Sequence, residues 1–253
     1  MSRLIDPTSQ PRDHPGLGVF SYPSHQSAIH SVMPTTQSSD SAAQDTPALI
    51  VFDHPLIAHK MATIRDQATN HRFFRAHLSQ IAGLMVYEVT RSFKTKPIPV
   101  QTPVTNTTAQ QLIGTITIVP VLRAGLGMIH GMLEVMPEAR VGHLGLARDE
   151  ETLEPIAYLN KLPKDLDAGP VILVDPMLAT GGSASAALTM LKDAGATDLR
   201  MICLVAAPEG VARLHKDHPG IKIYCAALDE RLDENGYIVP GLGDAGDRMY
   251  GTV

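Results

Sequence analysis

Tryptophan is absent from this sequence, and cysteine and the other aromatic residues are scarce. Aromatic residues make up 4% of the 253 residues, and Cys203 and Cys225 are the two thiols. So few aromatic rings argue against a protein that stacks the bases of a single strand. Two cysteines cannot form a disulfide framework or supply the four ligands of a zinc site. We therefore expect a reducing, intracellular setting, with both cysteines packed in the core.

Long apolar runs and an excess of positive charge are also missing. The longest apolar stretches, such as residues 171–174, are a handful of residues, far below the ~18 needed to span a bilayer. No charged-then-apolar signal segment opens the chain. There are 21 Lys and Arg residues against 26 Asp and Glu, a formal charge of -5, whereas nucleic-acid binders usually carry excess positive charge. We expect a cytoplasmic protein with no membrane and no nucleic-acid partner, in which any polyanion site is local.

The first 46 residues differ in composition from the rest of the chain. They are crowded with Ser, Gln, Pro, His and Thr, and their apolar residues are isolated. Such a segment cannot bury enough apolar surface to offset the entropy lost on ordering. We predict that residues 1–46 are a disordered N-terminal extension and that residues 47–253 form one catalytic domain.

From residue 47 onward, strand and helix signals alternate. Strands are predicted at 49–52, 116–122, 141–146, 171–174, 201–206 and 221–226, and helices from 54, and at 77–91, 128–136, 183–194 and 208–215. Strands separated by helices indicate an α/β fold with a mainly parallel central sheet flanked by helices. Residues 95–110, rich in Thr, Pro and Gln, predict a loop or edge segment, and the glycine-rich residues 235–251 predict an irregular loop.

The segment that follows the apolar run 171–174 has the composition of a phosphate cradle. An acidic residue, two glycines and two hydroxyl side chains stand between a buried strand and a helix, in the order Asp175, Pro176, Met177, Leu178, Ala179, Thr180, Gly181, Gly182, Ser183. Backbone N–H groups at a helix start, and glycines that allow close approach, suit a phosphate. There is no Walker lysine and no G-x-G-x-x-G pattern. A phosphorylated sugar is favoured; a plain turn in which Ser183 caps the helix is the alternative.

Two arginines could meet the remaining charge of such a ligand. Arg123 follows the strand at 116–122 and precedes Gly125 and Gly127. A guanidinium beside flexible backbone suits a pyrophosphate, although a surface salt bridge would explain it as well. Arg148 is followed by two acidic residues, so a solvated charge run is the alternative there.

These motifs resemble those of the type I phosphoribosyltransferases. Residues 175–183 are similar to the motif that binds 5-phosphoribosyl-1-pyrophosphate (PRPP), in the form typical of the uracil-specific branch, where Pro176 replaces a second acidic residue. Residues 119–128 resemble the family's pyrophosphate loop, and residues 235–251 resemble its uracil-binding loop. Further matching stretches are 54–57, 64–66, 87–91, 207–211 and 227–232, so that the resemblance covers residues 48–253.

The resemblance implies a type I phosphoribosyltransferase-like fold with a β-arm and a C-terminal base-binding region. It implies the conversion of uracil and PRPP to UMP and diphosphate, a step of pyrimidine salvage. Mg²⁺ would arrive bound to PRPP, with no direct protein ligand. The resemblance also implies a homo-oligomer, either dimer or tetramer, and GTP as an activator.

The resemblance assigns the site residue by residue. The catalytic residues would be Arg123, Arg148 and Asp244. PRPP would be bound by these three together with Asp175, Pro176, Met177, Leu178, Ala179, Thr180, Gly181, Gly182 and Ser183. Uracil would lie against Ile238, Gly243, Asp244 and Ala245. In the arm, many relatives have Tyr where this chain has Ala147.

Main-chain groups of the 235–251 loop could read uracil by its hydrogen-bonding edge. Uracil offers acceptors at O2 and O4 and a donor at N3, which a loop presenting N–H, C=O and N–H would match. Cytosine would leave such groups unpaired, at ~1–3 kcal/mol each. Three other functions stay open: a phosphoribosyltransferase for a purine or orotate, an RNA-binding regulator of the same fold, and a sugar-phosphate binder without turnover.

Overall fold

The computed structural model describes residues 48–148 and 155–252, with the side chains of Ala48 and Arg148 excluded. The predicted N-terminal extension, residues 1–46, lies outside the described residues. None of the helices in these two ranges is both long and apolar enough to cross a membrane.

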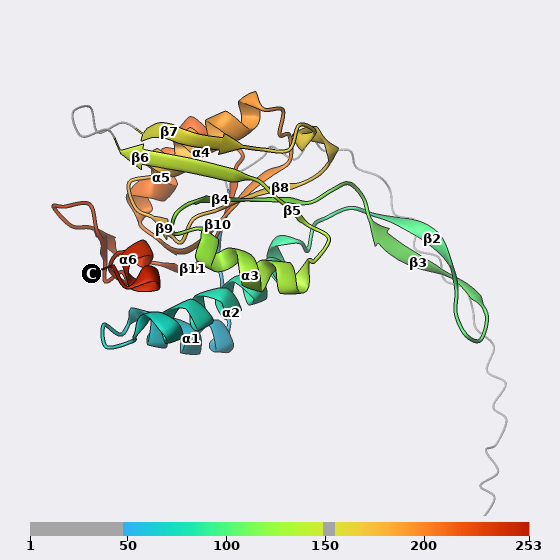
Figure 1. The fold of residues 1–253 in the computed structure, drawn as a ribbon, viewed down its shortest axis with the longest axis horizontal. Coiled ribbons are helices and arrows are strands. Elements are labelled where there is room, and N and C mark those ends of the chain that lie inside the picture. The colour runs from blue at the N-terminus through green and yellow to red at the C-terminus, as the bar shows by residue number, and fades with distance from the viewer. Residues whose placement is uncertain (1–47, 149–154, 253) are drawn as a thin grey trace, which may run out of the picture. The chain divides into compact units, whose positions relative to one another are not determined.

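A mainly parallel sheet forms the centre of the described chain, as predicted (Figure 1). Its strands run in the order β1-β11-β10-β8-β4-β6-β7, with β5 beside β4 and β9 beside β10. All of these pairings are parallel except that of β6 with β7. The strand bounds are β1 Ala48–Val51, β4 Thr117–Leu122, β5 Arg140–Val141, β6 His143–Arg148, β7 Pro155–Lys161, β8 Val171–Val174, β9 Met177–Leu178, β10 Leu199–Ala206 and β11 Lys222–Leu228.

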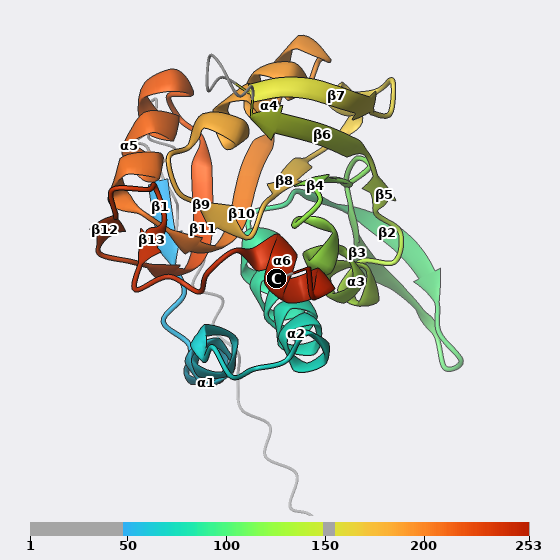
Figure 2. The same cartoon turned by 60° about the vertical axis from the view of Figure 1, so that its left-hand side comes forward.

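Helices cover both faces of this sheet (Figure 2). One face carries α1 (Pro55–Arg65), α2 (His71–Val89), α3 (Leu126–Val135) and α6 (Ala245–Tyr250); the other carries α4 (Gly182–Asp193), α5 (Pro208–Asp217) and the 3-10 turn η1 (Leu166–Ala168). Successive residues of β8 alternate between the two cores, Ile172 with the first and Leu173 with the second, as a strand buried on both faces requires. The predicted α/β class and the helices predicted from periodicity are confirmed.

Residues 95–112 form a hairpin that projects from the body of the domain (Figure 1). The loop prediction was therefore wrong, whereas the alternative of an edge segment fits, because both strands of a two-stranded sheet are edges. Strand β2 (Thr95–Gln101) pairs antiparallel with β3 (Asn106–Leu112). Pro97 and Pro99 concealed the strand in the sequence. They stand two residues apart, where a two-stranded ribbon turns every second N–H toward solvent, so that neither removes a ladder hydrogen bond.

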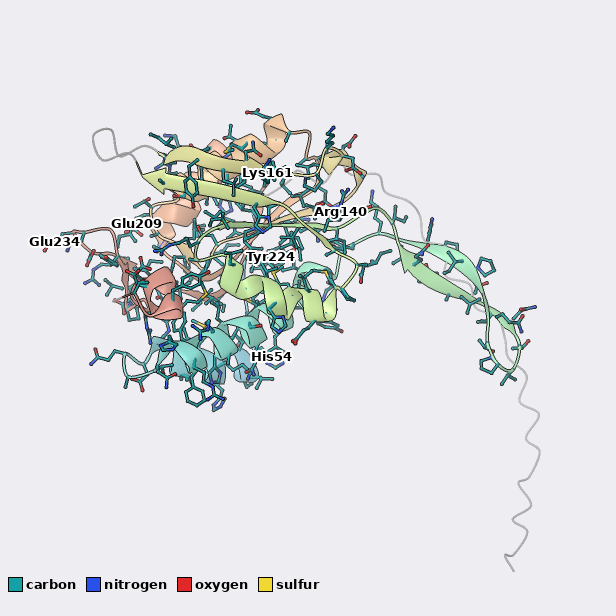
Figure 3. All side chains as sticks on the ribbon, in the orientation of Figure 1. His54, Arg140, Lys161, Glu209, Tyr224 and Glu234 are labelled. Atoms are coloured by element: carbon teal, nitrogen blue, oxygen red, sulfur yellow. The ribbon has the colours of Figure 1, made fainter. Side chains whose placement is uncertain are left out.

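The C-terminal stretch is more regular than the irregular loop that its glycines predict. Strands β12 (Arg231–Leu232) and β13 (Ile238–Val239) form a small antiparallel pair, which is followed by α6. Asp244 caps α6, since its Oδ1 accepts from the Asp247 N–H at 2.8 Å. The Glu209 carboxylate at the start of α5 accepts from the Leu232 N–H at 3.1 Å and ties this hairpin to the domain (Figure 3).

Candidate active site

The carboxyl ends of the neighbouring strands β4 and β8 open onto one cavity. The two strands pair in parallel, with Pro120 opposite Val174, so the loops that follow them leave the same edge of the sheet. The cavity has a volume of about 260 Å³ and is lined by Ala124, Asp175, Met177 and Ala179 from these loops and by residues 236–238 and 243–246 from the C-terminal segment. The structure therefore brings the first part of the predicted phosphate cradle, residues 175–179, to the predicted uracil-binding loop at 235–251, called the base loop below. Residues 180–183 of the cradle do not line this cavity and follow it along the chain.

The cradle is built at the start of α4. Gly181 is the N-cap residue and has a left-handed backbone, with φ of 77°. Since a glycine has no side chain to accept the first N–H groups of the helix, those groups are left for a ligand. The helix begins at Gly182, which places Ser183 inside its first turn instead of at the cap. The plain capped turn considered for Ser183 is therefore not what forms.

The other cradle residues differ in whether they line the cavity, support the loop from the core or lie at its surface. Met177 and Ala179 line the cavity, whereas Leu178 is buried in the second core. The Pro176 carbonyl accepts from two N–H groups of β10, at 2.9 and 3.1 Å, so this residue anchors the loop to the sheet. Thr180 is half-buried and Ser183 is exposed, so both hydroxyls lie near the surface of the loop.

Helix α5 supports the cradle from behind. A Cβ added at the buried Gly210 would lie 2.4 Å from the carbonyl oxygen of Ala179, so helix and loop are in direct backbone contact. One turn further along, the Arg213 guanidinium lies 3.3 Å from the point that a Cβ of Gly182 would occupy. The same guanidinium lies 3.4 Å from Oδ2 of Asp217 through its Nε, so Arg213 brings a partly paired positive charge to the cradle. No local sequence pattern links residue 213 to residue 182, so the sequence does not mark Arg213 as part of the cradle.

Asp175 faces the cavity with a perturbed carboxyl group. Burial raises its pKa to about 7, and the negative charge of Asp244 adds to the rise, while the Met177 N–H opposes it. Both carboxylates line the same cavity. When ionised, Asp175 is an acceptor for hydroxyl groups of a bound sugar.

Arg123 lies beside the cavity, between β4 and α6. Its side chain is 61% exposed and stands 3.7 Å from Oδ1 of Asp247, and its guanidinium lies 5.9 Å from the centre of the Tyr250 ring. Its carbonyl accepts from the Tyr250 hydroxyl at 3.4 Å. So exposed and long an ion pair holds the side chain weakly, which leaves the guanidinium able to turn toward a ligand.

Arg148 is the last residue of β6, and its side chain lies outside the described residues. Its backbone position is nevertheless informative. Strand β6 pairs with β4 through Leu144 and Val121 and with β7 in antiparallel fashion, so the predicted β-arm starts next to the loop that carries Arg123. Ala147, before it, is exposed.

The base loop presents main-chain groups. Ile238 is buried at its start, Gly243 is exposed with φ of 77°, and Ala245 opens α6. Arg248 holds the loop in place, because its Nη1 donates to the Leu242 carbonyl at 2.8 Å. The peptide groups of residues 243–246 therefore line the cavity on a braced backbone.

The two cysteines lie away from the cavity. Cys203 and Cys225 are both buried in the second core, as expected. Within residues 48–148 and 155–252, no cluster of three or more His, Cys, Asp or Glu side chains is arranged to hold a metal ion.

Comparison with known proteins gives consistent matches over this domain. A family model described as uracil phosphoribosyltransferase matches residues 51–252. A protein of that name from Acholeplasma laidlawii is 55% identical over 204 residues, covering 81% of this chain and 98% of the relative. One from Finegoldia magna is 55% identical over 203 residues, covering 80% and 97%. The solved structure of AQ2163 protein from Aquifex aeolicus, 39% identical, superposes with a TM-score of 0.76 and covers 80% and 97%.

Proposed function

Because this chain belongs to the uracil phosphoribosyltransferase family, we propose that the cavity at the ends of β4 and β8 is where it carries out the family reaction. The enzyme transfers the 5-phosphoribosyl group of PRPP to N1 of uracil and releases UMP and diphosphate, a step of pyrimidine salvage. The observation that supports this location most strongly is that residues of the 175–179 segment and of the base loop line one cavity of about 260 Å³. A sugar phosphate and a base must lie side by side for N1 to reach C1′.

The 5-phosphate of PRPP is assigned to residues 180–183. The left-handed Gly181 at the N-cap and the 12-residue helix α4 behind it offer N–H groups and the positive end of a helix dipole. Arg213 adds charge from α5. Asp175 is then placed to accept the ribose hydroxyls, and residues 176–179 connect it to the phosphate site.

The pyrophosphate leaving group is assigned to Arg123 and Arg148. Bond breaking at C1′ places negative charge on the diphosphate and positive charge on the ribose ring. A cation that follows the departing charge stabilises this transition state more than the bound substrate. Arg123 suits that role because its ion pair with Asp247, at 3.7 Å, is exposed. We assign Asp244, which lines the cavity together with Asp175 and whose charge raises the pKa of Asp175, to the positively charged ribose ring.

Mg²⁺ is proposed to enter as a complex with PRPP. Asp175 and Asp244 supply the hard oxygen donors that Mg²⁺ prefers, but two carboxylates do not make a cage. The residues present therefore fit a cation that is held mainly by substrate oxygens. When bound, it would neutralise charge on the diphosphate.

Uracil is assigned to the peptide groups of Ile238, Gly243, Asp244 and Ala245. Main-chain donors and acceptors on a braced loop cannot rotate to suit a different base, unlike side-chain amides. A base that lacks the N3 proton, such as cytosine, would leave buried groups unpaired. Selectivity for uracil thus follows from backbone geometry.

A homo-oligomer, GTP activation and a cytoplasmic location are further proposals. The projecting hairpin exposes Val104, and Tyr87 and Val135 are exposed along a cavity of about 600 Å³ beside α2. Such apolar surface suits contact with a second copy of the chain. Activation by GTP and the cytoplasmic location rest on family resemblance.

The experiment that tests the function is a base-competition assay with PRPP and Mg²⁺. Labelled uracil should be converted to UMP, and an excess of guanine, hypoxanthine, orotate or cytosine should not suppress the conversion. Conversion of guanine or orotate with no UMP from uracil would overturn the assignment. A tight, salt-sensitive RNA complex without UMP formation would indicate the RNA-binding regulator, and PRPP binding without turnover would indicate a sugar-phosphate binder.

A further inference from the structure

A half-buried ion pair beneath the base loop forms hydrogen bonds with both backbone groups of one glycine; its arginine side chain is 26% exposed. Arg65, the last residue of α1, and Asp229, which follows β11, meet through two hydrogen bonds of 2.5 and 2.9 Å. The Asp229 Oδ2 also accepts from the Gly241 N–H at 2.9 Å, and the Arg65 Nη1 also donates to the Gly241 carbonyl at 2.7 Å. The Asp229 side chain is 4% exposed.

Through Gly241, this ion pair can fix the backbone conformation of the base loop. It stands between Ile238 and residues 243–246, which line the cavity. Its φ is 61°, and an added Cβ would lie 2.1 Å from the Ile238 carbonyl oxygen, so a glycine is required there. Fixing both the N–H and the C=O of this residue leaves the adjoining peptide planes no freedom to rotate.

A second set of hydrogen bonds, made by Arg248 of α6, joins the same loop to the end of α1. Arg248 donates to the Leu242 carbonyl at 2.8 Å and, from the same nitrogen, to the Ile64 carbonyl at 2.5 Å. Its other nitrogen donates to the Asp66 carbonyl at 2.6 Å. Residues 64–66 therefore serve as a fixed base against which the loop is aligned.

We propose that Arg65 and Asp229 are positioning residues for uracil. Neither residue lines the cavity, but both set the backbone of residues 238–245 so that its N–H and C=O groups point at the base. Burying an ion pair is costly, and an apolar pair of similar volume would often stabilise a fold as well. An ion pair differs from such a pair in holding a donor and an acceptor of a third residue at once. This inference rests on the proposed site for uracil.

The test compares Arg65→Lys and Asp229→Asn with a matched control, Arg140→Lys. The control changes the Arg140–Asp165 pair, whose hydrogen bond is 2.7 Å long and which lies away from the base loop (Figure 3). Lysine keeps the charge of Arg65 but cannot bind both Asp229 oxygens and the Gly241 carbonyl together. Asparagine keeps an acceptor for the Gly241 N–H and loses the charge, so it provides a milder variant should Arg65→Lys fail to fold.

We expect the KM for uracil to rise about tenfold or more in both variants, as the loss of a charged hydrogen bond predicts. The KM for PRPP should stay within about twofold, and Arg140→Lys should change neither constant. Equal increases of both KM values, or a lower melting temperature with unchanged KM for uracil, would reduce the pair to a structural role and overturn the inference. A wild-type enzyme that makes no UMP in the same assay would instead refute the proposed function.

Discussion

Replacement of Gly210 by alanine tests whether α5 holds the phosphate cradle. The added Cβ would lie 2.4 Å from the Ala179 carbonyl oxygen and 2.9 Å from that of Leu178, where ordinary contact starts at 3.4 Å. Relieving the closer contact moves helix and loop apart by about 1 Å, and a misplacement of this size in a binding site can lower the rate by ~10²-fold. We therefore expect kcat/KM for PRPP to fall about 10- to 100-fold, with the KM for uracil nearly unchanged.

Stability should respond less than activity in this variant. Overpacking costs about 1–3 kcal/mol, and about 1 kcal/mol of this is returned because alanine is the better helix former. Gly83→Ala is the matched control, since its Cβ would meet the Gly131 carbonyl oxygen at 2.9 Å between α2 and α3. Initial rates at varied PRPP decide the matter. A kcat/KM for PRPP that is unchanged in Gly210→Ala, or lowered equally in Gly83→Ala, would refute the support of the cradle by α5.

Three further predictions concern single charged or titratable groups. Arg123→Ala should lower kcat about 10²- to 10³-fold in a UMP-formation assay, and unchanged turnover would remove Arg123 from the mechanism. Because the pKa of Asp175 is raised to about 7 and its proposed role toward the ribose hydroxyls requires the ionised form, kcat/KM for PRPP should increase as pH rises through 7. Asp244→Asn removes the like charge and should shift this increase to lower pH; a profile that stays in place would contradict the coupling. Burial, together with the positive charge of Lys192, lowers the pKa of His218 below its ordinary value of 6.5. Between the lowered pKa and pH 6.5, His218 therefore binds protons more readily in the unfolded chain than in the folded one. The free energy of unfolding should thus be highest above about pH 6.5 and decrease as pH falls toward the lowered pKa. His218→Gln should flatten that part of the curve in denaturant titrations from pH 5 to 8, and an unchanged slope would show that other groups cause it.

Much of the fold could be predicted because its signals are local. The run at 171–174, buried on both faces, and the loop and helix after it are contiguous in the sequence, and Gly195, with φ of 95°, ends α4 as expected. The hairpin at 95–112 was missed because its strands carry two prolines and polar side chains that face solvent. Helix α6 was missed because it is six residues long and flanked by glycines, too short for a periodic pattern.

The site was less accessible from the sequence. Each segment could be given a chemical role from its composition, but residues 175 and 244 meet only in the folded chain. Their meeting was inferred from family resemblance instead of physics. The supports of the site, Gly210 beneath the cradle and Arg65 with Asp229 beneath the base loop, act through contacts between residues far apart in sequence. No local pattern marks such contacts.

The most direct test of the proposed phosphate, base and diphosphate positions in the active site is a crystal structure of the enzyme with UMP and diphosphate. We expect the 5′-phosphate to accept hydrogen bonds from the N–H groups of residues 180–183. The O2–N3–O4 edge of the base should face main-chain groups of residues 238–245, and the diphosphate should lie against Arg123. A base whose edge is read by side chains, or a phosphate bound away from the start of α4, would contradict the account.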